Sequence, residues 1–174
     1  MQIRKATKED IGRITEIYSE IHSAEEQGFS TTCWIRGVYP VPETAEAALE
    51  RDDLYVLEAG GEVVGSAIIN NQQMEEYRLG DWKYTPRDEE VTVLHTLVIS
   101  PGVSGRGYGK AFVDYYEKYA VATNSPYLRF DTNEKNTRAR EMYKKLGYTE
   151  AGIIRCDFSG IKNVNLVMLE KLAK

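Results

Sequence analysis

The heptapeptide Ser104-Gly105-Arg106-Gly107-Tyr108-Gly109-Lys110 lies between two segments of different periodicity. Before it, Val91 to Ile99 is apolar and β-branched apart from one histidine, which predicts a buried central strand. After it, Lys110 to Ala122 carries aromatic residues at helical intervals. Three alternate glycines let the backbone approach a ligand closely, and a helix start offers unpaired N–H groups and a positive dipole end. The heptapeptide is therefore a candidate phosphate-binding turn.

Two familiar phosphate loops fit this heptapeptide poorly. A P-loop ends in Gly-Lys-Ser/Thr, but Gly109-Lys110 is followed by Ala111, and Ser104 stands in the place of the first glycine. A dinucleotide fingerprint needs G-x-G-x-x-G, whereas these glycines are spaced two and two. Kinase and Rossmann-type functions are therefore excluded. Taken alone, the heptapeptide could equally be a flexible turn between a strand and a helix.

The flanking sequence predicts alternating strands and helices in a single domain spanning residues 1–174. Apolar β-branched runs and turn residues predict strands at 2–5, 54–58, 63–70, 91–99, 127–132, 153–158 and 164–169. Helical spacing predicts helices from Ile11 to before Gly28, over 43–51, over 110–122, and along 139–146, where Gly147 ends the helix. The polar stretch 72–90 is expected to be a loop. After residue 90 the predicted order is strand, glycine turn, helix, strand and helix. This order indicates an α/β or α+β fold with parallel or splayed strands.

Composition narrows the class of protein. No run approaches the roughly 18 apolar residues of a membrane span, and the first ten residues lack the apolar core of a signal peptide, so we expect a cytoplasmic protein. In that compartment Cys33 and Cys156 are expected to be free thiols. The net charge of −5 argues against a nucleic-acid partner and favours an amine or other cationic substrate.

A second block, Asn136-Thr137-Arg138-Ala139-Arg140-Glu141-Met142-Tyr143-Lys144-Lys145-Leu146-Gly147-Tyr148, resembles the N-x-x-A-x-x-x-Y-x-x-x-G-F/Y helix of the GNAT superfamily of N-acetyltransferases. The segment 104–109 resembles that family's pyrophosphate loop, Q/R-x-x-G-x-G/A. Ser104 departs from the usual Gln or Arg, which removes a side chain but keeps the backbone N–H groups. The resemblance covers about residues 91–150 closely and the rest by order of elements.

This resemblance implies a mixed, splayed sheet of six or seven strands with about four helices, and acetyl-CoA between the fourth and fifth strands. It implies that the backbone of Leu97, Val98 and Ile99 pairs with the pantetheine arm and that Asn136 contacts its end. The pyrophosphate would be held by Gly105, Arg106, Gly107, Tyr108, Gly109 and Lys110. The plainer interpretations are a core strand for 97–99 and a helix N-cap for Asn136.

The same resemblance makes Tyr143 the general acid near the sulfur of the leaving thiolate. A phenol with a pKa of about 10 can donate a proton to a thiolate whose conjugate acid has a pKa near 8.5. An amine must lose a proton before it attacks a thioester, and His95, ordinarily near pKa 6.5, is a candidate acceptor. Strand alternation predicts that Val93, His95 and Leu97 share one face. Asp131 and a bound water are the competing bases.

The acceptor site is predicted least well. In the family that the chain resembles, the segment after the first helix and the last strands form it, so Trp34, Tyr39 and Phe158 are candidates for an aromatic wall. His22 is given no role. Two histidines without an HExxH or paired-cysteine motif predict no metal site, and the lack of G-x-S-x-G favours direct transfer. The leading hypothesis is therefore an acetyl-CoA-dependent N-acetyltransferase acting on a primary amine of a small molecule.

Two other functions stay open. The chain could acetylate a protein N-terminus or a lysine side chain, or it could be a non-catalytic acyl-CoA-binding module. Exposed edge strands would permit a homodimer. The acceptor and the length of the acyl chain are not fixed by the sequence.

Overall fold

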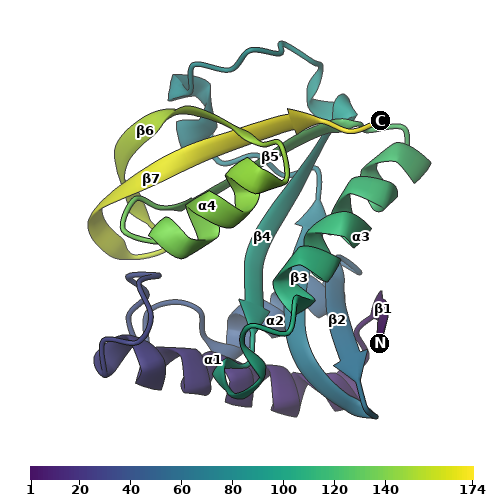
Figure 1. Ribbon diagram of the computed structural model, residues 1–174, viewed down its shortest axis with the longest axis vertical. Coiled ribbons are helices and arrows are strands. Elements are labelled where there is room, and N and C mark those ends of the chain that lie inside the picture. Colours follow the sequence, from purple (N-terminus) through teal and green to yellow (C-terminus); the bar gives the residue numbers. More distant parts are fainter.

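Seven strands form one mixed sheet in the computed structural model, which describes residues 1–174, in the order β1-β2-β3-β4-β5-β7-β6 (Figure 1). All neighbouring pairs are antiparallel except β4 and β5. The expected mixed sheet is therefore confirmed. The strands are β1 (Gln2–Lys5), β2 (Leu54–Ala59), β3 (Glu62–Asn70), β4 (Val91–Ile99), β5 (Tyr127–Asn133), β6 (Thr149–Phe158) and β7 (Ile161–Leu172).

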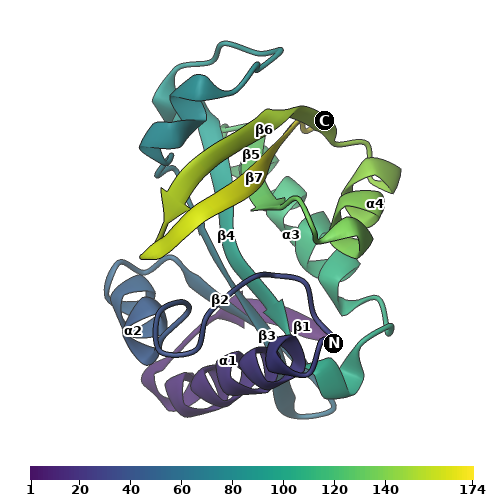
Figure 2. The same cartoon turned by 90° about the vertical axis from the view of Figure 1, so that its left-hand side faces the viewer.

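Four α-helices cover the two faces of this sheet: α1 (Ile11–Glu26), α2 (Pro42–Glu50), α3 (Tyr108–Ala122) and α4 (Thr137–Lys145). Figure 2 shows α1 and α2 on one side and α3 and α4 on the other. Ile14 and Ile17 of α1 are fully buried against the first face, and Phe112 and Tyr116 of α3 are fully buried against the second. These residues recur at the helical spacing that predicted both helices, so burial of one apolar stripe holds each helix on the sheet.

β4 and β5 separate soon after they begin. They pair only where Val91, Thr92 and Val93 face residues 127–129, and no pairing continues beyond Val93. From that point β5, β7 and β6 turn away from β4 as a second half of the sheet (Figure 1). The backbone edge of β4 from residue 94 onward, on the side of β5, is therefore left without a strand partner.

A β-bulge lies in β4 where the two halves separate. From His95 to Val98, β4 advances three residues while β3 advances two, and Thr96 adopts a φ of 49°. The extra residue reverses the alternation beyond it. Val93 packs in the core beneath β6 and β7, whereas Leu97 packs against the core beneath α3. The prediction that Val93, His95 and Leu97 share one face is therefore wrong.

Several smaller features differ from the sequence-based expectation. β6 begins at Thr149 rather than at Ile153, because an irregularity near Gly152, whose φ is 113°, interrupts the alternation that marks a strand. The stretch 72–90 contains two short 3₁₀ turns, Glu75–Leu79 and Asp88–Glu90. Cys33 and Cys156 are free thiols, as expected. None of the helices has both the length and the apolar character needed to cross a bilayer.

Candidate active site

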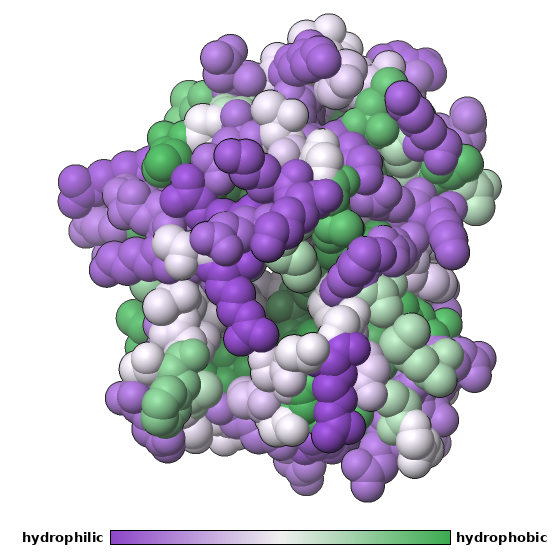
Figure 3. Space-filling view, in the orientation of Figure 1, coloured by the Kyte–Doolittle hydropathy of each residue, from purple (hydrophilic) through white to green (hydrophobic).

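A cavity of about 210 Å³ lies where β4 and β5 separate. Leu94 and Tyr143, which line it, belong to the core on the α3 side, whereas Ile161 and Val164, which also line it, belong to the core on the opposite side. The cavity therefore connects the two faces of the sheet through the gap between its halves. Figure 3 shows a hollow near the middle of the molecule, with hydrophobic residues at its bottom.

Tyr143 extends from α4 into this cavity. Its ring packs edge-on against Phe130 with centroids 4.5 Å apart, and the residue is 7% exposed. Its hydroxyl forms no hydrogen bond within the protein, yet it is not sealed in the core. Burial raises the pKa of Tyr143, and the nearby charge of Asp131 raises it further. At neutral pH this phenol is a protonated O–H donor that faces open space.

Asp131 extends from β5 into the same cavity. The hydroxyl of Tyr77 donates to its Oδ2 at 2.8 Å, and Oδ1 has no partner in the protein. Burial raises the pKa of Asp131 to about 6, although the hydrogen bond from Tyr77 opposes that shift. The carboxyl group therefore changes its charge close to neutral pH. A group of that kind can accept a proton and later release it.

His95 also lines the cavity, in the bulge of β4. Its Nε2 lies 3.1 Å from Oδ1 of Asn70, and Nδ2 of Asn70 donates to Asp53 at 2.8 Å. Because the carboxylate of Asp53 only accepts, it turns the amide so that Oδ1 faces the imidazole, and Nε2 is the donor in that contact. Burial lowers the pKa of His95 to about 4, so the ring is neutral at physiological pH.

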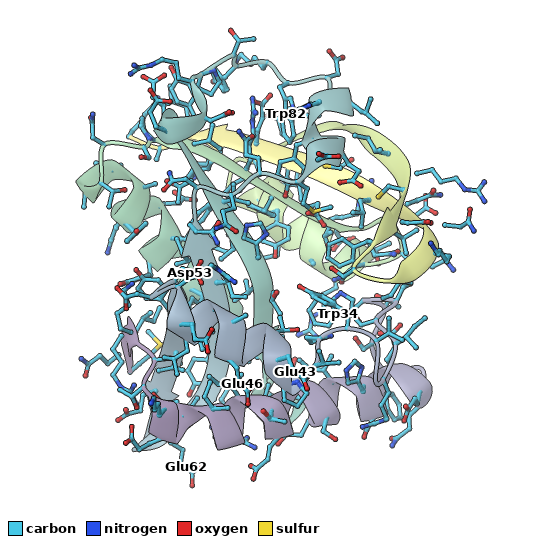
Figure 4. All side chains as sticks on the ribbon, turned by 180° about the vertical axis from the view of Figure 1, so that it is seen from behind. Trp34, Glu43, Glu46, Asp53, Glu62 and Trp82 are labelled. Atoms are coloured by element: carbon cyan, nitrogen blue, oxygen red, sulfur yellow. The ribbon has the colours of Figure 1, made fainter.

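Three aromatic rings form one wall of the cavity. Tyr39 lies between Trp34 and Phe158, with centroid distances of 5.6 Å and 5.0 Å and nearly perpendicular planes. The hydroxyl of Tyr39 is hydrogen-bonded to Thr96 at the bulge. Figure 4 shows Trp34 between α1 and the β6–β7 hairpin. The structure thus brings together the three residues that were expected to form an aromatic wall.

The glycine-containing turn leads into α3 beside the same gap. Gly105 and Gly107 have φ values of 84° and 81°, which other residues adopt only at a cost, and a Cβ atom on either would point into open space. None of the six consecutive backbone N–H groups from Gly105 to Lys110 donates to another backbone group. Arg106 is exposed, and Lys110 forms an exposed ion pair with Asp114. The turn is a row of free donors at a helix start, which suits an anion.

Asn136 has the plainer role that was considered for it, since it is the N-cap of α4. Its Oδ1 accepts from the backbone N–H of Ala139 at 3.4 Å, and its Nδ2 donates to Thr132. The side chain also lines the cavity. His22 is buried on α1, where Nε2 contacts the carbonyl of Pro40 at 3.0 Å. It lies outside the site.

Sequence reasoning missed the contribution of the stretch 72–90. Met74 lines the cavity, and Tyr77 reaches Asp131 across 54 residues of sequence. The stretch is fixed to the sheet by Arg129, whose guanidinium lies 4.3 Å from the ring centroid of Trp82 (Figure 4), and by buried Glu170, which accepts from backbone N–H groups of the stretch. The one available signal was three large aromatic residues in an otherwise polar segment.

Comparisons with known proteins show the family and the fold of this chain. The model of the acetyltransferase (GNAT) family matches residues 13–148. An uncharacterized N-acetyltransferase of Methanocaldococcus jannaschii is 23% identical over 88% of this chain, which spans 62% of that relative's length. A GNAT-family acetyltransferase structure from Streptococcus agalactiae superposes with a TM-score of 0.84 at 22% identity, covering 99% of this chain and 95% of the other. The yncA structure from Salmonella typhimurium, solved with its cofactor acetyl-CoA, gives 0.69 at 19% identity and covers 100% and 94%.

Proposed function

Because this chain belongs to the acetyltransferase (GNAT) family, we propose that it transfers the acetyl group of acetyl-CoA to a primary amine of a small molecule. The observation that carries the proposal is the pair of Tyr143 and Asp131. A protonated phenol and a carboxyl group that titrates near neutral pH meet in one cavity, at the gap where the two halves of the sheet part.

The residues around the gap fit the co-substrate. The free N–H groups from Gly105 to Lys110 would hold the diphosphate, since no Cβ atom blocks its approach at Gly105 or Gly107. The unpaired backbone edge at Leu97, Val98 and Ile99 would accept the pantetheine arm as an added strand. The position of Asn136 on the cavity is compatible with a contact to the end of that arm.

The reaction needs two proton transfers, one from the amine to a base and one from an acid to the sulfur. The amine loses a proton as its nitrogen forms a bond to the acetyl carbonyl carbon, and the carbon–sulfur bond then breaks to leave a thiolate. Asp131 accepts the first proton, because its pKa of about 6 lies near neutral and its Oδ1 is free. Tyr143 donates the second proton to the sulfur. Both groups then return to their starting state by exchange with solvent.

His95 is the alternative proton acceptor, but its chemistry suits that role less well than the chemistry of Asp131 does. With a pKa of about 4 it would accept a proton from an ammonium group much less readily than Asp131 does. Its Nε2 is also engaged as a donor to Asn70. We therefore assign the base to Asp131 and give His95 the role of a neutral polar group in the wall.

A small acceptor is favoured by the shape of the cavity. Trp34, Tyr39 and Phe158 close one side, and Met74 adds to the lining from the stretch 72–90. A protein N-terminus or lysine side chain would need an open groove along which the rest of the chain could pass. Short peptides are therefore the acceptors to compare with small amines in an activity assay.

The test is a thiol-release assay with acetyl-CoA against small amines and short peptides. Wild-type protein should acetylate small amines in preference to peptides. Tyr143→Phe should lower kcat by roughly 10² to 10⁴, because a general acid contributes about that much, while the affinity for coenzyme A changes little. Tyr127→Phe, on β5 outside the cavity, is the matched control. Unchanged kcat in Tyr143→Phe would remove this residue from the mechanism, and binding without any transfer would indicate a non-catalytic module.

A further inference from the structure

The cavity contains one carboxylate and no lysine or arginine, and its one histidine, His95, is neutral at physiological pH. Of the twenty residues that line it, Asp131 is the only acid, and none is lysine or arginine. An amine acceptor that also carried a carboxylate or phosphate would need a cationic partner for that group when it left water. The lining offers none.

Building on the proposed function, we infer that the acceptor is a monoamine with an apolar or aromatic body and no acidic group, whose ammonium is received by Asp131. Oδ1 of Asp131 has no protein partner, so it can bind the ammonium. One proton of the ammonium passes to solvent to give the free amine, and Asp131 then accepts the proton that leaves the nitrogen as the carbon–nitrogen bond forms. The hydrogen bond from Tyr77 to Oδ2 holds the carboxyl group in place meanwhile. An ion pair in a site shielded from water is much stronger than on the surface.

A second anion on the acceptor would work against this pair. The α-carboxylate of an amino acid lies only two bonds from its amine, so it would be brought close to Asp131 whenever the amine was bound. Like charges at that separation repel, and the lining has no lysine or arginine to offset the repulsion. The lining therefore selects against amino acids by charge rather than by size.

The body of the acceptor is set by the aromatic wall of the cavity. The edge-to-face rings of Trp34, Tyr39 and Phe158 present apolar surface to the cavity. A dry apolar cavity of about 150 Å³ accommodates benzene, and this one measures about 210 Å³. One ring, or a chain of similar size, therefore fits together with a short arm that carries the amine.

Matched ligands separate charge from shape. Protein saturated with coenzyme A is titrated by calorimetry with 2-phenylethylamine and with phenylalanine, which differ only in the carboxylate. We expect 2-phenylethylamine to bind at least tenfold more tightly. Hexylamine and 1,5-diaminopentane have chains of similar length. Hexylamine should bind more tightly than the diamine, because the cavity has no second carboxylate for a second ammonium. Equal or tighter binding of phenylalanine would overturn the inference.

Variants then test the role of Asp131. Asp131→Asn keeps an oxygen that can accept from Tyr77, so the hydrogen bond that holds the side chain is preserved. It should weaken binding of 2-phenylethylamine by about ten- to a hundredfold, the range for losing a hydrogen bond to a charged group. Asp52→Asn, on an 84% exposed side chain, is the matched control. An unchanged affinity in Asp131→Asn would overturn the inference.

The same ligands separate this inference from the proposed function. Transfer of acetyl groups to both members of a pair at equal rates would leave the proposed function standing and contradict the inference. Preferential binding of 2-phenylethylamine without transfer to any amine would support the inference and contradict the proposed function.

Discussion

Replacing Tyr77 by Phe removes one oxygen atom and, with it, the hydrogen bond that this tyrosine donates to Asp131. The donor and acceptor oxygens are 2.8 Å apart, and Tyr77 is 2% exposed, so no water readily takes the place of the lost hydroxyl. The hydrogen bond favours the ionised carboxylate, because a charged acceptor gains more from it than a neutral one. Tyr77→Phe should therefore raise the pKa of Asp131.

The size of the effect follows from the strength of such bonds. A hydrogen bond to a charged group contributes about 1.5 to 3 kcal/mol, and about 1.4 kcal/mol corresponds to one pKa unit. The pKa of Asp131, about 6 in the wild-type protein, should therefore rise to roughly 7 or 8. Since the base must be ionised to accept a proton, the pH below which activity falls should rise by the same amount.

The assay is the pH dependence of kcat/KM, which reports ionisations in the free enzyme. In the wild-type protein the acid limb should lie near pH 6, and in Tyr77→Phe it should lie about one to two units higher. Tyr84→Phe is the matched control, since Tyr84 lies in the same stretch but stacks on Tyr127, away from Asp131. An acid limb that stays in place in Tyr77→Phe, or moves to lower pH, would refute the assignment of Asp131 as the base.

Two further predictions concern buried titratable groups. Asp131 has a pKa of about 6 in the folded protein against an ordinary 3.8, so its contribution to stability is present below about pH 4 and is lost as the pH rises through 6. In urea denaturation, the free energy of unfolding of Asp131→Asn relative to wild type should therefore rise by up to about 3 kcal/mol between pH 4 and pH 8. The same difference at both pH values would contradict the raised pKa of Asp131. His95 has a pKa of about 4 against an ordinary 6.5, so wild-type protein loses stability as the pH falls from 6.5 toward 4. His95→Gln should remove up to about 3 kcal/mol of that loss of stability. The same variant should leave the acid limb of kcat/KM in place, and a displaced limb would indicate that His95 is the base.

Local patterns predicted the elements that carry the co-substrate site. The apolar run 91–99 predicted the bounds of β4 correctly, because a mostly buried run rich in β-branched residues and bounded by turn residues is typical of a central strand. Gly107 and Gly147 mark the start of α3 and the end of α4, where both adopt positive φ values. Each of these features depends on residues close together in the chain.

The acceptor side depends on contacts that no local pattern encodes. The bulge at Thr96 arises from a mismatch between β3 and β4, and it redirected Leu97 without any change in the apolar run. Tyr77 reaches Asp131 from a stretch that has no period of its own. The high pKa of Asp131 follows from its burial in the folded protein, so it could not be inferred from a lone aspartate in a strand.

Calorimetric titration with coenzyme A tests whether the free backbone N–H groups after Ser104 bind the diphosphate. Gly107→Ala and Gly60→Ala place the same Cβ atom at φ values of 81° and 66°, so both variants bear a similar backbone cost of about 1 to 2 kcal/mol. Only Gly107 lies in the glycine-containing turn. We expect one coenzyme A molecule to bind per wild-type chain, with the affinity lowered at least tenfold in Gly107→Ala and unchanged in Gly60→Ala. Absence of binding to the wild-type protein, or equal binding by both variants, would contradict this expectation.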